Sequence, residues 1–433
     1  MADSTPEGTG AEATVERLGV HGDGVATVDG QALYIPFAAP GDRLRVQPGA
    51  PRGDGREARI LDILAPGPDR VVPPCPHFGT CGGCAFQHLA SPCVADHKRD
   101  LLRRALAQRG LEIEVAETIS IPPGTRRRVS LAFRRGRTPV LGFNRRASHE
   151  VFDLAACPVL HPDLTALIAP LRGALAPLAA LGRQADLRLT RTDSGIDLLL
   201  VPERPRAPDL DIRMTLADLA EAHDLARVSW QADPRRGGAA IEPVAARRAP
   251  RVTFGDAAVR IPADAFLQPS VEGERALAGL TVAAVAAAAH PVRRIADLYA
   301  GCGSLSFPLA GLAPVHAVEG DATMLAALTQ ARGTRPMTTE TRDLARRPLS
   351  ATELSRFDAV VFDPPRAGAH AQAAQIAASR VPTVVAVSCN PATLGRDLRL
   401  LVDGGYHIER AVPVDQFPWS AHVEAVVVLR RPA

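Results

Sequence analysis

Residues 384–397 read VVAVSCNPATLGRD, and this stretch indicates how the C-terminal part of the chain folds. The apolar, β-branched run Val384–Val387 is typical of a buried strand, and Pro391 cannot continue a strand ladder. A helix is expected to begin near Thr393, because leucines three or four residues apart follow it. Cys389 therefore lies where a strand gives way to a loop, the edge at which open α/β sheets bind ligands. Taken alone, it is equally well interpreted as a buried core cysteine.

The composition excludes several classes of protein. A chain of 433 residues suggests two or three domains, and 46% hydrophobic residues are enough for folded cores. No apolar run reaches the ~18 residues of a membrane helix. The first 12 residues lack the basic start and apolar core of a signal peptide, so we expect a disordered tail. Seven cysteines without a secretory signal predict a reducing, cytoplasmic location, where clustered cysteines bind metal or do chemistry.

Positive charge is concentrated in one part of the chain. The formal net charge is only +3, but residues 98–146 contain 13 basic and four acidic residues. The basic residues include Arg126–Arg128 and the arginines of residues 134–137. A solvated face would also explain them, but we interpret the stretch as a surface that contacts phosphates.

Residues 13–65 have the pattern of short strands separated by glycine turns. Asp29-Gly30 between alternating apolar residues predicts a hairpin. The spacing favours a small β-barrel, a fold that often holds nucleic acid or another domain. A purely structural cap is the alternative.

The cysteines Cys75, Cys81 and Cys84 form a C-x5-C-x2-C pattern after a proline-rich linker. Three cysteines within ten residues predict a metal site, and Cys157 is the candidate for a fourth ligand. Four thiolates suit tetrahedral zinc or an iron–sulfur cluster, and spacing does not choose between them. A Cys3His zinc site stays open, with three further candidate residues: Cys93, His77 and His88.

A cofactor loop is predicted after a strand at residues 294–298. The strand is followed by Gly301-Cys302-Gly303 and a helix, the arrangement in which glycine lets the backbone approach a ligand. Glu319 ends the next strand 18 residues after Gly301, where a carboxylate can hold ribose hydroxyls. Because the full G-x-G-x-x-G is missing, S-adenosylmethionine is favoured over a dinucleotide.

Two more carboxylates are expected at the same edge of the sheet. Asp363 ends the apolar strand 357–362 and is followed by two prolines, and Glu424 lies near the start of the last strand, 421–429. A loop cap and an ordinary surface carboxylate are the alternatives. We expect the cofactor loop, Asp363, Cys389 and Glu424 to meet at one edge.

Together these residues resemble the S-adenosylmethionine-dependent RNA 5-methyluridine methyltransferases over nearly the whole chain. The segments that carry the resemblance are the cysteine cluster with Cys157, Phe266-x-Gln268, Asp297–Gly303, Glu319, Asp363-Pro364-Pro365-Arg366, Ser388-Cys389-Asn390-Pro391 with Thr393-Leu394 and Arg396-Asp397, and His422-Val423-Glu424. Residues 13–65 resemble the TRAM domain of the ribosomal-RNA branch, whereas the transfer-RNA branch typically lacks both this barrel and the cysteine cluster. Ser270, Ser304 and Trp419-Ser420 depart from the usual residues of the family.

The resemblance implies a role for each candidate residue. Cys389 would add to C6 of uracil, so that C5 becomes nucleophilic toward the methyl group, and Glu424 would remove the C5 proton. Phe266 would stack on the uracil. Four residues would contact S-adenosylmethionine: Gln268, Tyr299, Glu319 and Asp363. Four would bind a [4Fe–4S] cluster: Cys75, Cys81, Cys84 and Cys157.

We therefore expect an α/β protein. Its C-terminal domain, residues 263–433, would be a Rossmann-like class I methyltransferase domain, residues 13–65 a TRAM/OB-like β-barrel, and residues 66–262 a mixed α+β RNA-binding domain with the cysteine cluster. The expected partner is RNA, with 23S rRNA favoured over tRNA, and the expected state is a monomer without membrane contact. The alternatives are a tRNA uracil-C5 methyltransferase, a cytosine-C5 enzyme, and an inactive iron–sulfur RNA-binding protein.

Overall fold

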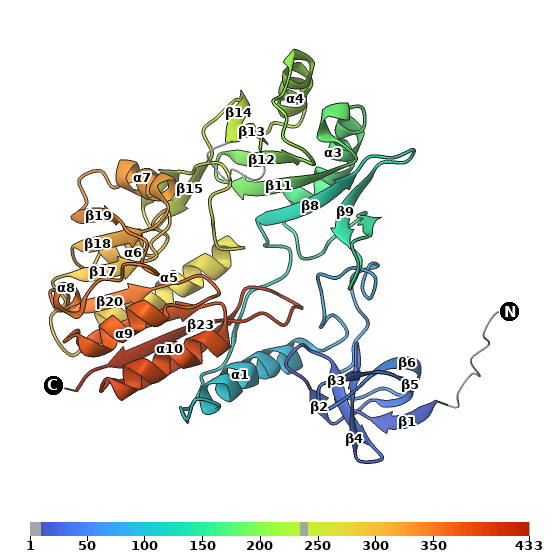
Figure 1. Cartoon of the computed structure of the whole chain (residues 1–433), viewed down its shortest axis with the longest axis horizontal. Coiled ribbons are helices and arrows are strands. Elements are labelled where there is room, and N and C mark those ends of the chain that lie inside the picture. Colours follow the sequence, from blue (N-terminus) through green and yellow to red (C-terminus); the bar gives the residue numbers. More distant parts are fainter. Residues whose placement is uncertain (1–9, 234–240, 433) are drawn as a thin grey trace.

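The computed structural model describes residues 10–233 and 241–432, which form three sheets and a two-stranded hairpin (Figure 1). The N-terminal sheet has the order β1-β5-β6-β4-β3-β2. The hairpin predicted at Asp29-Gly30 joins β3 to β4, and both turn residues have positive φ (51° and 76°). Its strands are β1 (Ala11–Thr14), β2 (Arg17–Leu18), β3 (Gly24–Val28), β4 (Gln31–Ile35), β5 (Arg43–Arg52) and β6 (Gly55–Ala65).

The predicted tail is shorter than expected. Ala11 and Glu12 are paired with Val46 and Arg45 in β1, because their backbone groups complete the ladder of β5. Residues 1–9 of the predicted tail lie outside the described residues.

The central sheet has the order β10-β9-β8-β11-β12-β13-β14, with short helices packed on it. Its strands are β8 (Arg128–Arg134), β9 (Val140–Asn144), β10 (Val151–Asp153), β11 (Gln184–Thr192), β12 (Gly195–Pro202), β13 (Arg227–Gln231) and β14 (Ile241–Ala246). The helices are α2 (Pro162–Ala166), α3 (Ile168–Leu175), the 3-10 turn η1 (Ala179–Leu181) and α4 (Leu210–Ala222). The hairpin β15 (Arg251–Phe254) and β16 (Ala257–Arg260) follows it.

The C-terminal sheet has the order β19-β18-β17-β20-β21-β23-β22-β7. Strands β17 to β21 run parallel, and β23 is antiparallel to β21. Its strands are β7 (Ile119–Ser120), β17 (Ile295–Leu298), β18 (Val315–Glu319), β19 (Met337–Thr341), β20 (Ala359–Phe362), β21 (Thr383–Ser388), β22 (His407–Asp415) and β23 (Glu424–Arg430).

Helices cover both faces of this sheet, so its strands are buried on two sides (Figure 1). Alternate strand residues enter opposite cores: Val385 packs with α5 and α7, whereas Val384 packs with α1, α9 and α10. The helices are α1 (Ser91–Ala107), α5 (Val271–Ala286), α6 (Ser306–Ala310), α7 (Ala322–Ala331), α8 (Ala351–Leu354), α9 (His370–Ala378) and α10 (Pro391–Asp403). Helix α1 and strand β7, which the sequence placed in the central region, therefore pack on the C-terminal sheet.

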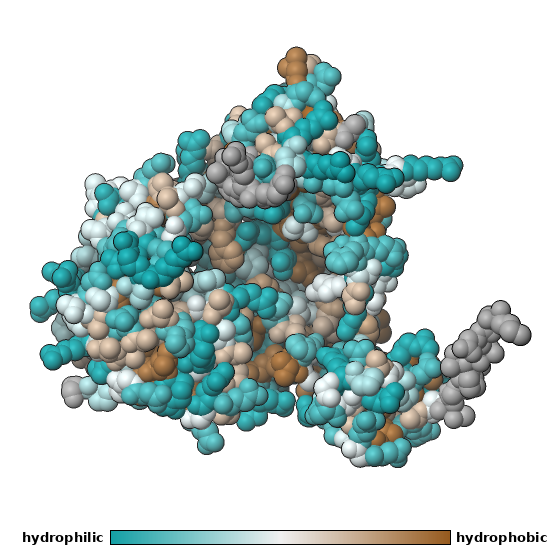
Figure 2. All heavy atoms as spheres, in the orientation of Figure 1, coloured by the Kyte–Doolittle hydropathy of each residue, from teal (hydrophilic) through white to brown (hydrophobic). Residues whose placement is uncertain are grey.

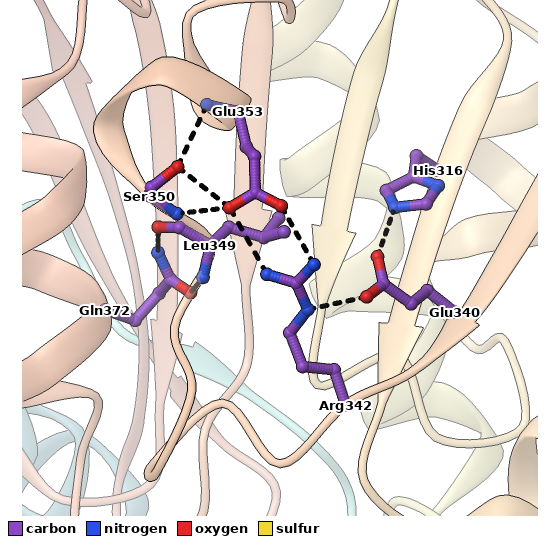
Figure 3. Close-up of polar contacts among 7 residues, drawn as sticks. All are labelled: His316, Glu340, Arg342, Leu349, Ser350, Glu353 and Gln372. Atoms are coloured by element: carbon purple, nitrogen blue, oxygen red, sulfur yellow. Dashed lines mark hydrogen bonds and ion pairs between the residues drawn. The ribbon is translucent and has the colours of Figure 1, made fainter.

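A polar network orders the connection between β19 and β20 (Figure 3). Arg342 donates to Glu340 (2.6 Å) and to Glu353 (2.9 Å), and Glu353 completes a capping box with Ser350 at the start of α8. The side chain of Gln372 pairs with both backbone groups of Leu349 (2.9 and 3.1 Å). The ends of β18 and β19 are thus fixed by contacts away from the candidate site. No helix among the described residues has the length and apolar character needed to cross a membrane.

Candidate active site

Strand register brings four of the predicted residues to one edge of the C-terminal sheet. Leu298 is paired with Phe362, and Phe362 with Ala386, so Tyr299 and Asp363 both follow the last pairs at the carboxyl ends of their strands. Ser388 is paired with Ala425. Cys389 follows this last pair and Glu424 precedes Ala425 in antiparallel β23, so the two residues come close enough for the charge of Glu424 to raise the pKa of Cys389, whose main cause is burial. Cys389, Glu424, Asp363 and Tyr299 therefore share the edge where open α/β sheets bind ligands.

Cys389 lies in the short connection between β21 and α10. Asn390 caps α10 by accepting from the Ala392 N–H (3.2 Å), and its amide donates to the Arg366 carbonyl (3.0 Å). Burial raises the pKa of Cys389 to about 11, and the nearby carboxylates of Glu424 and Asp363 add to the shift. The thiol is therefore protonated at neutral pH unless positive charge is added close by.

Glu424 is buried at this edge, and Asp363 is partly buried beside it. Burial raises the pKa of both, and the charge of Asp363 raises that of Glu424 further. Hydrogen bonds oppose these shifts: the Gln268 amide donates to Asp363 (3.2 Å), and the Gln416 side chain bonds Glu424. Two adjacent carboxyls favour a cationic ligand, because a positive charge would stabilise their ionised forms.

The glycine loop after β17 has a strained backbone. Tyr299, a non-glycine residue, has φ 64°, and Gly303 has φ 100°. A Cβ at Gly303 would lie 2.6 Å from the ring of Phe307, so the loop can only follow this path with glycine there. Glu319 joins the loop by accepting from the N–H groups of Gly301 (2.9 Å) and Asp321 (2.8 Å).

Asp297 is a further acidic residue behind this loop. One of its carboxylate oxygens accepts from Ser306 (2.5 Å), and the other has no hydrogen-bond partner. Burial raises the pKa of Asp297 to about 7, with Asp363 and Glu319 contributing. A glycine loop backed by an unsatisfied carboxyl suits S-adenosylmethionine, which carries positive charge and no phosphate.

Gln268 and Phe266 belong to the segment that precedes α5. Gln268 is buried, and its side chain bridges Asp363 and Gln416 (2.8 Å from the Gln416 amide). The ring of Phe266 is 61% exposed, with the Arg128 guanidinium 5.2 Å from its centre. An exposed ring beside the edge agrees with the predicted stacking role, which stays a prediction.

Of the three arginines predicted to contact phosphates, Arg127 lacks an exposed surface for that role, whereas Arg126 and Arg128 are partly exposed and their role stays a prediction. Arg127 is buried, forms an ion pair with Glu274 and donates to the Gln268 carbonyl (3.0 Å). Arg128 donates to the Leu267 carbonyl (2.7 Å), and Arg126 to the Arg128 carbonyl (3.0 Å). Arg127 and Arg128 thus satisfy backbone carbonyls of the segment that holds Gln268 and help to fix its position. Arg137, Arg145 and Arg146 are exposed.

The four candidate cysteines come from loops in two parts of the chain. Each of Cys81, Cys84 and Cys157 has its pKa raised by burial first and then by the charge of other members of the set, which includes Cys75. No group of three or more His, Cys, Asp or Glu side chains in the described part of the chain is placed to hold a single metal ion. Four thiolates suit a tetrahedral zinc ion or an iron–sulfur cluster, and the cluster stays a prediction.

The three alternative zinc ligands face other groups. Burial raises the pKa of Cys93, and the charges of Asp69 and Asp96 raise it further. Burial lowers the pKa of His88, whose charged neighbours are Arg70 and Asp42. The Nε2 atom of His77 accepts from the Ala155 N–H (3.3 Å).

Three residues at the site were missed by the sequence reasoning. Gln416 bonds both Gln268 and Glu424, and Asp415 precedes it as an ion-pair partner of Lys98. The available signal was a polar Asp-Gln pair directly after the apolar end of β22. Lys98 carried no local signal, because its partner is 317 residues away.

Comparison with known proteins places the chain among RNA methyltransferases. Residues 335–432 match the family model described as tRNA (Uracil-5-)-methyltransferase. An uncharacterized RNA methyltransferase of Brucella suis is 42% identical, covering 96% of this chain and 97% of that protein. A 23S rRNA (uracil(1939)-C(5))-methyltransferase of Halomonas elongata is 34% identical, covering 97% and 89%. The crystal structure of a Pyrococcus abyssi tRNA (uracil-54, C5)-methyltransferase with S-adenosyl-L-homocysteine has the same fold, with a TM-score of 0.74 at 22% identity, covering 96% and 99%.

Proposed function

We propose that this chain, which belongs to the S-adenosylmethionine-dependent RNA (uracil-C5) methyltransferases, uses Cys389 as nucleophile and Glu424 as general base on a uridine of 23S rRNA. The observation that carries the two residue roles is the register of β21 and β23. The proposal is supported by the last pair of this ladder, Ser388 with Ala425, because Cys389 and Glu424 directly adjoin it and the charges of Glu424 and Asp363 act on the Cys389 thiol. A nucleophile and a base that act on adjacent ring carbons need such an arrangement.

The proposed reaction follows from the weakness of C5 of uracil as a nucleophile. The Cys389 thiolate adds to C6, and the C5–C6 electron pair becomes an enolate with the C4 carbonyl. C5 would then attack the methyl group of S-adenosylmethionine, the sulfonium S–CH3 bond would break, and S-adenosylhomocysteine would leave. Glu424 then takes the proton from C5, the C5–C6 double bond re-forms, and the C6–S bond breaks to return the thiolate. The uracil must first leave its stack, which costs a few kcal/mol.

The electrostatics of the edge bear on when the thiolate forms. Cys389 is a thiol in the free protein because burial and two carboxylates raise its pKa. Positive charge from the bound methyl donor would offset these carboxylates, and Arg366 already lowers the pKa of the thiol. Addition to uracil would therefore follow binding of the donor. The raised pKa of Glu424 makes it a stronger proton acceptor than an ordinary carboxylate.

Cys75, Cys81, Cys84 and Cys157 are proposed as the ligands of a [4Fe–4S] cluster. The grouping of the four thiols supports this assignment: burial raises the pKa of Cys84, and the nearby charges of Cys157, Cys81 and Cys75 raise it further. The cluster would join the loop of residues 75–84 to the loop that contains Cys157. It would supply no electron, since methyl transfer is not a redox reaction.

The RNA target is proposed to be rRNA, because a relative with 34% identity over nearly the whole chain carries an rRNA name. The tRNA enzyme of Pyrococcus shares the fold at 22% identity and does not identify a substrate. Mapping 5-methyluridine in rRNA and tRNA of a deletion strain tests the choice. Loss of 5-methyluridine from tRNA alone would favour tRNA as the substrate. A cytoplasmic location agrees with either RNA.

The decisive experiment on the base is Glu424→Gln, which keeps the shape of the side chain and removes proton acceptance. Addition and methylation should proceed while elimination stalls, so methylated RNA should remain attached through Cys389 as a denaturant-resistant band carrying the methyl label. Glu409→Gln, a half-exposed carboxylate on neighbouring β22, is the control and should turn over normally. Normal turnover by Glu424→Gln would show that another group takes the proton. Binding of the methyl donor without methyl transfer by the unaltered protein would favour the inactive RNA-binding alternative.

A further inference from the structure

Lys98 is the only lysine in the chain, and its side chain is fully buried (0% exposed). It projects from α1 and forms an ion pair with Asp415, the last residue of β22. Its ammonium also donates to the carbonyl of Phe417 (3.0 Å). A buried ammonium is costly unless both its charge and its N–H groups are satisfied, and here two groups of one turn satisfy them.

That turn begins the connection from β22 to β23, residues 416–423, which ends at Glu424. Asp415 accepts from the Phe417 N–H (3.1 Å), so Lys98 and Asp415 together fix the backbone on both sides of Gln416. Gln416 is 2% exposed, and its amide donates to Gln268 (2.8 Å). Glu424 is the strand partner of Val414, the residue before Asp415, and Gln416 opposes the rise that burial causes in the pKa of Glu424. The orientation of Gln416 therefore depends on the ion pair beside it.

The far end of the same connection is fixed separately. The carbonyl of Trp419, a residue with φ 60°, accepts from the N–H groups of Ala85 (2.7 Å) and Phe86 (3.0 Å). Trp419 and Ala421 also pack on the buried cluster that contains Phe86. In Figure 1 this connection extends from the start of β23 toward the loops between the N-terminal and central sheets, and Figure 2 shows the surface hollowed where these regions meet. Of these two sets of contacts, those of Lys98 with Asp415 and Phe417 are nearer in sequence to Gln416 than those of Trp419.

We propose that Lys98 is a positioning residue for Glu424, acting through Asp415 and Gln416, an inference that rests on the proposed role of Glu424 as base. Lys98 touches neither reacting atoms nor donor. It fixes the turn from which the Gln416 side chain reaches Glu424 and Gln268, and so sets the distance between base and uracil. An arginine would not replace it, because a planar guanidinium is larger and the site is closed to solvent.

The test is the double variant Lys98→Met/Asp415→Asn, which removes both charges, keeps their volumes and leaves an oxygen for the Phe417 N–H. Uncharged replacements of buried ion pairs commonly fold. We expect kcat to fall by about 10- to 100-fold with KM for RNA and for S-adenosylmethionine within about twofold, since a small misplacement of a catalytic group costs this much. Because elimination slows, the steady-state fraction of enzyme held as the RNA adduct should rise.

The matched control is Arg227→Met/Asp197→Asn in the central sheet, another poorly exposed ion pair, with both charges removed in the same way. A purely structural role for Lys98 predicts similar kinetics for the two double variants. Gln416→Met, which leaves the ion pair intact, should reproduce the kinetic loss even if the Lys98 variant fails to fold. Lys98→Arg, which keeps the charge but not the shape, should also have a lowered kcat.

The outcomes separate this inference from the proposed function. If Glu424→Gln accumulates the adduct while Lys98→Met/Asp415→Asn, or Gln416→Met, keeps the parental kcat without adduct, the positioning role is overturned and the base stands. If Glu424→Gln turns over normally, both fail. A lowered kcat with raised adduct in the Lys98 and Gln416 variants, and not in the Arg227 control, supports the inference.

Discussion

The edge of the C-terminal sheet and the cysteine loops both gather reactive side chains from distant parts of the chain, but by different means. At the edge, Asp363, Cys389 and Glu424 directly adjoin paired strand residues. The four cysteines lie in loops outside the regular strands. Backbone ladders place the first set, whereas turn hydrogen bonds and one isolated bridge, between Cys81 and Arg145, hold the loop that carries three of the second.

This difference has a consequence for stability. A group at the end of a ladder keeps its place whether or not its side chain reacts, because the ladder and the packed faces of the sheet hold the backbone. Side chains on loops depend on a cross-link, because ordering a loop costs about 1–2 kcal/mol per residue. Removing a reactive group should therefore leave the edge intact and disorder the cysteine loops.

The largest expected effect is that of Cys389→Ala. Methyl transfer should fall by about 10⁴-fold or more, since removal of a nucleophile costs on this order. The melting temperature should stay close to that of the unaltered protein, because β21 and α10 do not depend on the thiol. Cys93→Ala, at a cysteine outside both sets, is the control for activity. A large fall in melting temperature for Cys389→Ala would contradict placement by the ladder.

The next effect concerns the metal. Protein purified without oxygen should be brown, absorb broadly near ~400 nm and contain about four irons per chain. Cys84→Ser should lose the iron and lower the free energy of unfolding by several kcal/mol, because metal binding contributes to folding. Iron analysis and thermal melts check this. A colourless protein with one zinc would reject the cluster, and an iron-free variant with unchanged stability would remove the contrast between the two regions.

The same contrast explains what could be predicted from the sequence. The β-branched runs before Asp363 and Cys389 identify parallel strands, and parallel strands present their following residues at one edge. The carboxyl ends were therefore predictable without coordinates. Glu424 was expected at the same edge, but the antiparallel pairing of β23 with β21 that brings it there is contained in no local pattern. The raised pKa of Cys389 was not predictable either, because it depends on burial and on two distant carboxylates.

The basic stretch shows where local reasoning failed. A run of three arginines reads as a charged surface, but Arg127 has a buried partner in Glu274, 147 residues later. Lys98 and Asp415 are separated by 317 residues. Ion pairs of this kind are fixed by packing between helices and sheets, so composition does not reveal them.

A smaller effect is expected from Asp297→Asn. This variant tests whether the buried carboxyl of Asp297 destabilises the free protein and favours binding of the cationic methyl donor. Burial raises the pKa of Asp297 to about 7 from its ordinary value of 3.8, so the folded protein binds this proton more tightly than the unfolded chain. The stability from this group is therefore complete below pH 3.8 and lost as pH rises to 7. Between pH 5 and pH 8 the advantage of Asn over Asp should grow by about 1–3 kcal/mol.

Urea unfolding at the two pH values measures this advantage, and calorimetry at pH 8 should show weaker binding of S-adenosylmethionine to the variant. Ser306→Ala, which removes only the hydrogen bond to Asp297, is the control and should lack the gain at high pH. A gain that is the same at pH 5 and pH 8 would mean that Asp297 has an ordinary pKa.

The smallest effect concerns the arginines that remain exposed. Arg137 lies in the turn between β8 and β9, which projects from the central sheet (Figure 1), whereas Arg127 is buried behind Gln268. If Arg137 contacts a phosphate, Arg137→Gln should reduce the slope of log affinity against log salt by about 0.7–0.9 and leave stability unchanged. Arg127→Gln should instead lower the free energy of unfolding, because Glu274 would be left buried without a partner. RNA titrations at several salt concentrations, with melts of both variants, distinguish the two roles. An unchanged slope for Arg137→Gln would make that turn a solvated face and direct the search for phosphate contacts to Arg145 and Arg146.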